Sequence, residues 1–214
     1  MDETKIILPK NKNCGLCGEN SCEELLSLIK SGVKKSDACP FCYEKTKNLT
    51  EDISTTNHKG IDVFQHNYDF LLNPLPGEIS AIKIVLPFRT DLVEKLDIQK
   101  DDIVVGRPMG AGCPIPHVLK VIKVEELTGL IYSWVVGPKF SRDKKVKDVQ
   151  AYHMIGFEGI ASNCSKDIVC GARYTFLPGF CMMNLNHTGL VNMVLEKSYG
   201  MHIRIEDIRI LASI

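Results

Sequence analysis

The uneven distribution of cysteine is the sequence feature that most constrains the fold. Five of the nine cysteines fall within the first 42 residues: Cys14, Cys17, Cys22, Cys39 and Cys42. Unligated thiols have no packing reason to cluster at such spacings, whereas a metal or an iron-sulfur cluster binds several thiolates at once. The sequence therefore predicts a small cysteine module at the amino terminus and a separate, larger domain after it.

The order of these cysteines matches the ligand spacing of an iron-sulfur cluster. Cys14-x2-Cys17-x4-Cys22 is followed sixteen residues later by Cys39, which precedes a proline. Four thiolates suffice for a [4Fe-4S] cubane, and glycines in the first loop let backbone amides turn toward the cluster sulfurs. We therefore predict a [4Fe-4S] cluster held by Cys14, Cys17, Cys22 and Cys39.

A short helix is expected between the third and the fourth ligand. Ser21 and Glu24 form a capping box, and Gly32 supplies a stop, so the helix is predicted over residues 22–31. Cys22 then stands at the first helical position, where the helix dipole favours the thiolate over the thiol.

Zinc is the alternative that the spacing leaves open. Cys14-x2-Cys17 and Cys39-x2-Cys42 form two CxxC pairs, as in a zinc ribbon. A ribbon places such pairs on hairpin turns, whereas here a capped helix lies between them and Cys22 is left over. In the iron-sulfur interpretation, Cys42 is the spare cysteine.

The segment CGLCGENSCEELLSLIKSG, with DACP after it, resembles a known family of small four-cysteine iron-sulfur domains. These domains occur in the large subunit of the corrinoid iron-sulfur protein and in the B subunit of the Rnf complex. The resemblance covers about residues 13–42. It implies Cys14, Cys17, Cys22 and Cys39 as ligands of a [4Fe-4S] cluster and assigns no role to Cys42.

The rest of the chain is similar to uncharacterised iron-sulfur proteins of anaerobic archaea and bacteria. The stretches that carry this likeness run from GRPMGAGCPIPH to FLPGFCMMNLNHTGLVN. The likeness implies an anaerobic host and names no reaction.

The chain after the cysteine module has the pattern of a β domain. Short β-branched runs separated by Gly, Pro and Asp predict strands at 81–86, 102–105, 118–124, 130–136, 152–160, 169–176, 189–196 and 202–211. We expect an α+β fold, in which a small helical iron-sulfur module precedes a mainly antiparallel β-barrel or sandwich. The predicted divisions are a cluster module at 1–45, a polar linker or excursion at 46–75, and a β-rich domain at 76–214.

Two loops rich in glycine and proline carry the candidate chemistry of the second domain. One contains Cys113 and is followed by His117, and the other contains Cys181 and is followed by His187. Loops at one end of a β domain can meet although they are distant in sequence. We expect these two to converge on a shared site, either for a ligand or, with Cys164 and Cys170, for a second iron-sulfur cluster.

The charge balance narrows the classes of binding partner that the sequence favours. The chain has 26 Lys and Arg against 26 Asp and Glu, so no net field favours nucleic acid or a membrane surface. No run of apolar residues is long enough for a spanning helix or a signal peptide, and we expect a cytoplasmic protein.

Three functions fit these observations. The first is electron transfer to a redox partner protein in anaerobic metabolism. The second is an enzyme with its site near Cys113, Cys181 and His187. The third is a non-enzymatic assembly factor or partner subunit, and homo-oligomerisation stays open.

Overall fold

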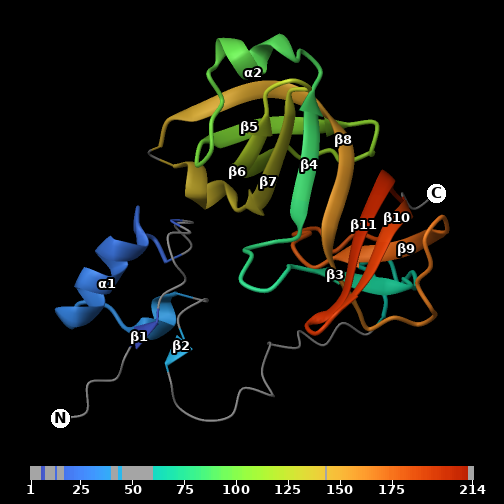
Figure 1. The fold of residues 1–214 in the computed structure, drawn as a ribbon, viewed down its shortest axis with the longest axis horizontal. Helices are drawn as coiled ribbons and strands as arrows, with labels where there is room; N and C mark the ends of the chain where they lie inside the picture. The colour runs from blue at the N-terminus through green and yellow to red at the C-terminus, as the bar shows by residue number, and fades with distance from the viewer. Residues whose placement is uncertain are drawn as a thin grey trace. The chain divides into compact units, whose positions relative to one another are not determined.

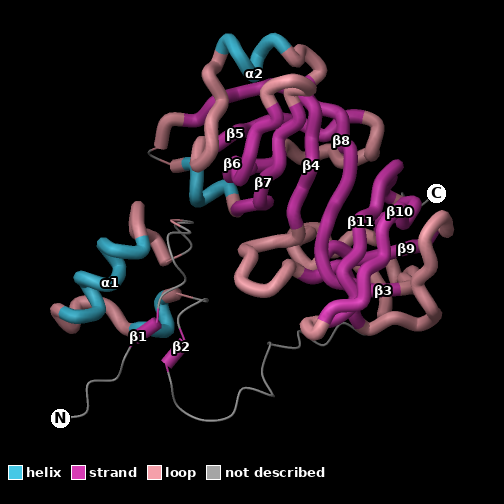
Figure 2. The backbone as a smooth tube through the Cα atoms, viewed as in Figure 1, coloured by secondary structure: helices cyan, strands magenta, loops and turns pink. Residues whose placement is uncertain are grey.

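The computed structural model describes residues 6–7, 13, 17–39, 43–44, 60–142 and 144–211. The chain divides into two compact units, residues 1–58 and 59–214, and each is described here by itself. Figure 1 labels their elements, and Figure 2 shows that strands dominate the second unit. No helix among the described residues has the length and apolar character needed to cross a bilayer.

The first unit contains one well-capped helix, α1 (Cys22–Lys30). The Ser21 side chain accepts a hydrogen bond of 3.0 Å from the amide of Glu24, which satisfies a donor that the first turn leaves open. Leu25 is the buried residue of the helix, and Gly32 ends it in a left-handed conformation with φ of +74°. The predicted helix is confirmed to within one residue.

The other described elements of this unit are short. They are the 3₁₀ helix η1 (Ser36–Ala38) and the strands β1 (Ile6–Ile7) and β2 (Tyr43–Glu44), which pair antiparallel. The prediction of a helical module is therefore wrong, since the described part of the unit combines one nine-residue helix with a small sheet.

The described residues of the second unit form nine strands and two short helices. The strands are β3 (Phe70–Asn73), β4 (Ile82–Pro87), β5 (Ile103–Met109), β6 (His117–Glu125), β7 (Leu130–Val136), β8 (Val146–Ser162), β9 (Arg173–Pro178), β10 (His187–Lys197) and β11 (Gly200–Ile210). The helices are α2 (Asp91–Lys95) and the 3₁₀ helix η2 (Pro138–Ser141).

The nine strands form one mixed sheet in the order β11-β10-β9-β3-β8-β4-β7-β6-β5. Strand β8, the long curved orange strand of Figure 1, spans 17 residues and also pairs with β11 and β5. Its first half pairs with β5 and β4, and its second half pairs with β3, β4 and β11. The β3–β9 and β5–β8 pairings are parallel, and the others are antiparallel.

The predicted fold class, a barrel or sandwich after a helical module, is wrong. The strands belong to one mixed sheet because β8 is long enough to pair with four other strands. The sequence pattern predicted only its second part, 152–160, since the charged residues before Gln150 are typical of a solvated loop. These charged residues instead form the parallel pairing with β5. Strand β3 was not predicted at all.

The described residues of the unit form four hydrophobic clusters, of which two are large. Around Phe70, which stacks on Phe176 with ring centroids 5.5 Å apart, one cluster joins β3, β8, β9, β10 and β11. The other joins β4, β5, β6, β7 and β8, and α2 packs against it through Leu92 and Val93. Because β8 contributes to both clusters, it connects the two halves of the core.

Candidate functional site

The described cysteines of the first unit lie at the two ends of the helical segment. Cys17 precedes α1, Cys22 is its first residue, and Cys39 follows η1. Cys17 and Cys22 are free thiols of intermediate exposure, whereas Cys39 is buried. The other two candidates, Cys14 and Cys42, lie outside the described residues.

Lys34 connects the chain after the helix to the loop before it. Its Nζ atom donates a 3.0 Å hydrogen bond to the carbonyl of Cys17 and pairs with the carboxylate of Glu19. The amide of Cys22 donates to the side chain of Asn13 at 2.9 Å. The segment that leads to Cys39 is thus anchored beside the loop that carries Cys17.

In the second unit, the two predicted loops meet. Cys113 lies between β5 and β6, and Cys181 lies between β9 and β10. Both line one pocket of about 50 Å³, together with His117 and His187. Each histidine is the first residue of the strand that follows its cysteine loop, so the strand ends fix both imidazoles.

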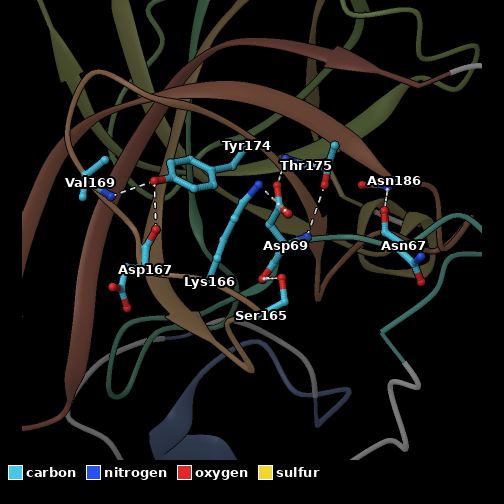
Figure 3. Close-up of polar contacts among 9 residues, drawn as sticks. All are labelled: Asn67, Asp69, Ser165, Lys166, Asp167, Val169, Tyr174, Thr175 and Asn186. Atoms are coloured by element: carbon cyan, nitrogen blue, oxygen red, sulfur yellow. Dashed lines mark hydrogen bonds and ion pairs between the residues drawn. The ribbon is translucent and has the colours of Figure 1, made fainter.

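Hydrogen bonds from the end of β11 hold both loops. The amide of Ile210 donates to the carbonyl of Ala111 at 2.7 Å, and the amide of Leu211 donates to the carbonyl of Asn186 at 3.0 Å. Asn186 is fully buried, and its side chain donates to the carbonyl of Asn67 at 2.8 Å, as Figure 3 shows. The loops therefore converge through backbone pairing rather than through the cysteines themselves.

A buried lysine lies behind the first loop. Lys83 of β4 is 1% exposed, and its Nζ atom contacts Nδ1 of His117 and donates to the hydroxyl of Tyr152 at 2.7 Å. On the other side of the His117 ring, Nε2 lies 3.4 Å from Sγ of Cys113. A thiol, an imidazole and an amine therefore stand in one hydrogen-bonded row.

The absence of a side chain at Gly106 leaves room for this hydrogen-bonded row. A Cβ atom at Gly106 would come within 2.9 Å of the ring of Tyr152 and within 2.8 Å of the side chain of Val149. Any larger residue would push the tyrosine away from Lys83. Lys83 was not among the predicted site residues, although a lone lysine inside the apolar run IKIVLP was the signal that could have revealed it.

Burial sets the charge of the amine and its neighbours. It lowers the pKa of Lys83 to about 7, while the thiols of Cys113 and Cys181 act in the opposite direction. Burial also raises the pKa of the Tyr152 hydroxyl well above its usual value. Lys83 therefore exchanges its proton near neutral pH, whereas Tyr152 keeps its own.

Both histidines are held in the neutral form. Burial lowers the pKa of His117 to about 3, and the charge of Lys83 adds to that effect. Burial lowers the pKa of His187 to about 4, although the carbonyl of Leu185, which accepts from Nδ1 at 2.8 Å, raises it. With Nδ1 donating, Nε2 of His187 is an acceptor.

The remaining two cysteines lie elsewhere. Cys164 and Cys170 are exposed on the connection between β8 and β9. Figure 3 shows what fixes this connection: Lys166 pairs with Asp69 at 2.9 Å, and the hydroxyl of Tyr174 donates to the carbonyl of Asp167 at 3.0 Å. These contacts are structural.

Within the ranges that the structure describes, no three His, Cys, Asp or Glu side chains are arranged to hold a metal ion. A second iron-sulfur cluster at Cys113, Cys164, Cys170 and Cys181 thus gains no support from the geometry. A larger hollow of about 850 Å³ lies between α2 and the β6–β7 turn, and no cysteine or histidine lines it.

Comparison with known proteins supports the assignment of the first unit. Residues 8–41 match a family model described as "Putative Fe-S cluster". An uncharacterised protein of Methanocaldococcus jannaschii is 32% identical over 199 residues, which cover 86% of this chain and 84% of that protein. No solved structure matches the chain.

Proposed function

This chain belongs to the same family as the uncharacterised Methanocaldococcus jannaschii protein, and from that premise we propose that it is a redox protein carrying one [4Fe-4S] cluster. The proposed ligands are Cys14, Cys17, Cys22 and Cys39. The match of residues 8–41 to an iron-sulfur family model is the observation that carries the proposal. The resemblance of residues 13–42 to the corrinoid iron-sulfur protein and Rnf domains supports the cubane form.

The described residues of the first unit fit such a cluster. The Cys22 thiol stands at the N-terminus of a nine-residue helix, where the partial positive charge favours thiolate. The contact of Lys34 with the Cys17 carbonyl brings a cation to the same loop and anchors the return toward Cys39. Buried Cys39 provides a donor shielded from water.

When bound, the cluster supplies a centre that takes up and releases one electron. The chain's own contribution is to hold the thiolates and to shield one side. Lys34 holds the Cys17 loop in place through its bond to the Cys17 carbonyl, while Glu19 of the same loop balances its charge.

A partner surface accompanies the redox role in this proposal. Val33, three residues after the end of α1, is 70% exposed and lies in the sequence between Lys30 and Lys35, whose side chains are also exposed. An exposed valine with a lysine on either side fits a redox partner with an acidic contact surface. The cytoplasmic location stays a prediction.

The cluster is tested by analysing protein purified without oxygen. We expect about four irons and about four acid-labile sulfides per chain, and an EPR signal that develops on reduction with dithionite. Stoichiometric zinc without acid-labile sulfide would refute the proposal in favour of the CxxC pairs.

The redox role needs a separate measurement. We expect the reduced cluster to be reoxidised by an acidic ferredoxin faster than by a basic electron acceptor of similar potential, because of the charges at Lys30 and Lys35. Replacement of both lysines by Gln is expected to remove this preference while the iron content stays the same. A cluster that undergoes no reversible reduction would contradict the redox role and leave the cluster assignment standing.

A further inference from the structure

The second unit carries a site that the cluster does not explain. Its core is the row formed by the Cys113 thiol, the His117 imidazole and the Lys83 amine. Sγ of Cys113 lies 3.4 Å from Nε2 of His117, and Nδ1 of the same ring contacts Nζ of Lys83. The thiol lies at a small pocket, whereas the amine is buried behind it.

We propose that Cys113 is a nucleophile that accepts a short acyl group from an activated ester or thioester, with its proton passed through His117 to Lys83. Cys113 is then the catalytic residue, His117 the proton carrier, and Lys83 a positioning residue that acts through the imidazole. The proposal rests on the second unit alone and is independent of the cluster.

The surroundings of Lys83 support its role as the proton acceptor. The amine lies 4.9 Å from the centroid of the Tyr152 ring and 5.8 Å from that of Phe157, and among the described residues no carboxylate acts on its pKa. The titratable groups that face it are Cys113, His117, Tyr152, Cys181 and His187. Because burial brings its pKa to about 7, a neutral amine is present at physiological pH.

The proton transfer balances in atoms and in charge. In the resting state the thiol proton faces Nε2 of His117, and Nδ1–H of the ring faces the neutral amine of Lys83. When Nε2 takes the thiol proton, Nδ1 gives its own to Lys83, so a thiolate and an ammonium form while the ring stays neutral. A neutral imidazole can accept a proton at one nitrogen while it donates from the other, as this transfer requires.

The acyl step then follows from the thiolate. Its sulfur forms a bond to the carbonyl carbon, and the bond from that carbon to the leaving group breaks. The leaving group takes the proton from Nε2 of His117, and Nδ1 recovers its proton from Lys83. The products are a thioester on Cys113 and the protonated leaving group, with no oxidant or reductant required.

The pocket limits the size of the acyl group. Its volume is about 50 Å³, and its walls include the apolar side chains of Ile115, Val135, Phe157 and Phe180. A cavity of this size holds only a few small groups, so the pocket admits a short acyl chain. Apolar walls favour an aliphatic chain over a charged one.

The reactivity of the thiol is tested on the full chain, purified without oxygen so that the proposed cluster ligands stay protected. Iodoacetamide labelling is followed for each cysteine by mass spectrometry of its peptide. We expect the rate at Cys113 to rise as Lys83, whose pKa is about 7, loses its proton, and then to level off. The exposed thiols of Cys164 and Cys170 serve as internal references, and their labelling rates are expected to follow a different pH dependence.

Two matched variants separate the relay from simple packing. Lys83→Met is expected to slow labelling of Cys113 at pH 7 by about tenfold or more, because an unassisted thiol is only a few per cent thiolate there. Lys123→Met removes an exposed lysine from β6 and is expected to leave the rate unchanged. If Lys83→Met does not fold, the pH dependence of Cys113 labelling in the wild type still tests the proton relay.

Acyl transfer is probed with 4-nitrophenyl acetate. We expect one acetyl group on Cys113, release of one equivalent of 4-nitrophenol, and acylation by the decanoate ester at least about tenfold slower. A Cys113 labelling rate that tracks Cys164 and Cys170 across the pH range would overturn the relay. Acetylation of those exposed thiols in preference to Cys113 would overturn the acyl site.

Discussion

The amide of Ile210 donates a 2.7 Å hydrogen bond to the carbonyl of Ala111, and this bond ties the first cysteine loop to the end of β11. The next amide along the chain, that of Leu211, donates to Asn186 in the second cysteine loop. Two consecutive residues of one strand end thus fix the relative position of two loops about seventy residues apart in sequence. The geometry of the pocket therefore depends on the end of β11 as well as on the two loops.

The first prediction concerns Asn186, whose side chain anchors the second loop. Asn186→Ala removes the donor to the Asn67 carbonyl at a fully buried position, so we expect a loss of about 1–3 kcal/mol in the free energy of unfolding. We also expect faster alkylation of Cys181. Urea denaturation followed by the fluorescence of Trp134, the only tryptophan, measures the first effect, and peptide mass spectrometry measures the second.

Asn192→Ala is the control, since Asn192 is exposed on β10. An Asn186→Ala variant as stable as this control would show that the buried hydrogen bond contributes little.

Local patterns predicted the local features. Ser21, Glu24 and Gly32 were enough to bound α1, because capping groups act within a few residues of the helix they stabilise. The two Cys loops were also visible, since glycine, proline and a following histidine stand close together in the sequence. That they share a pocket was a hypothesis about distant residues, and the structure places all four side chains there.

Long-range features were not predictable in the same way. The pairing of β8 with four other strands depends on contacts across the whole unit, and its first residues carry charges that resemble a loop. Lys83 was missed because a lysine in an apolar strand has no local partner in sequence, and Tyr152 and His117 are supplied by β8 and the start of β6.

The second prediction concerns the core. Phe70 is fully buried and stacks on Phe176, so Phe70→Ala leaves a cavity and is expected to cost about 3–5 kcal/mol in the free energy of unfolding. Phe64→Ala removes a phenylalanine that is half exposed and is expected to cost less than about 1 kcal/mol. Urea denaturation of the two variants compares them. Equal losses would mean that Phe70 does not pack as the structure shows.

The third prediction concerns the stability of the fold at acidic pH. The pKa values of His117 and His187 are about 3 and 4 in the folded state and about 6.5 in an unfolded chain. Between pH 6.5 and 4 the unfolded chain therefore binds more protons, so the free energy of unfolding falls as the pH falls through this window. Each histidine is expected to contribute about 2 kcal/mol to the difference between pH 7 and pH 4.5.

His187→Asn tests this dependence because asparagine keeps a donor for the Leu185 carbonyl and does not titrate. Its loss of stability on going from pH 7 to pH 4.5 is expected to be about 2 kcal/mol smaller than that of the wild type. His153→Asn, which replaces an exposed histidine of β8, is the control. Identical acid profiles for the wild type and His187→Asn would rule out buried His187 as a source of the effect.

The last prediction decides which four cysteines bind the cluster. In the iron-sulfur arrangement Cys22 completes the set from the start of α1, where the helix dipole stabilises its thiolate, and Cys42 is spare. In the zinc arrangement Cys42 completes the second CxxC pair, and Cys22 is spare. Cys22→Ser is therefore expected to abolish cubane assembly, and Cys42→Ser to retain about four irons per chain.

Each variant is the control for the other, since both exchange one sulfur for oxygen in the same unit. Iron, zinc and acid-labile sulfide are measured in both after purification without oxygen. Retention of metal by Cys22→Ser together with its loss from Cys42→Ser would assign the ligands to the two CxxC pairs, and stoichiometric zinc without acid-labile sulfide would identify the metal as zinc.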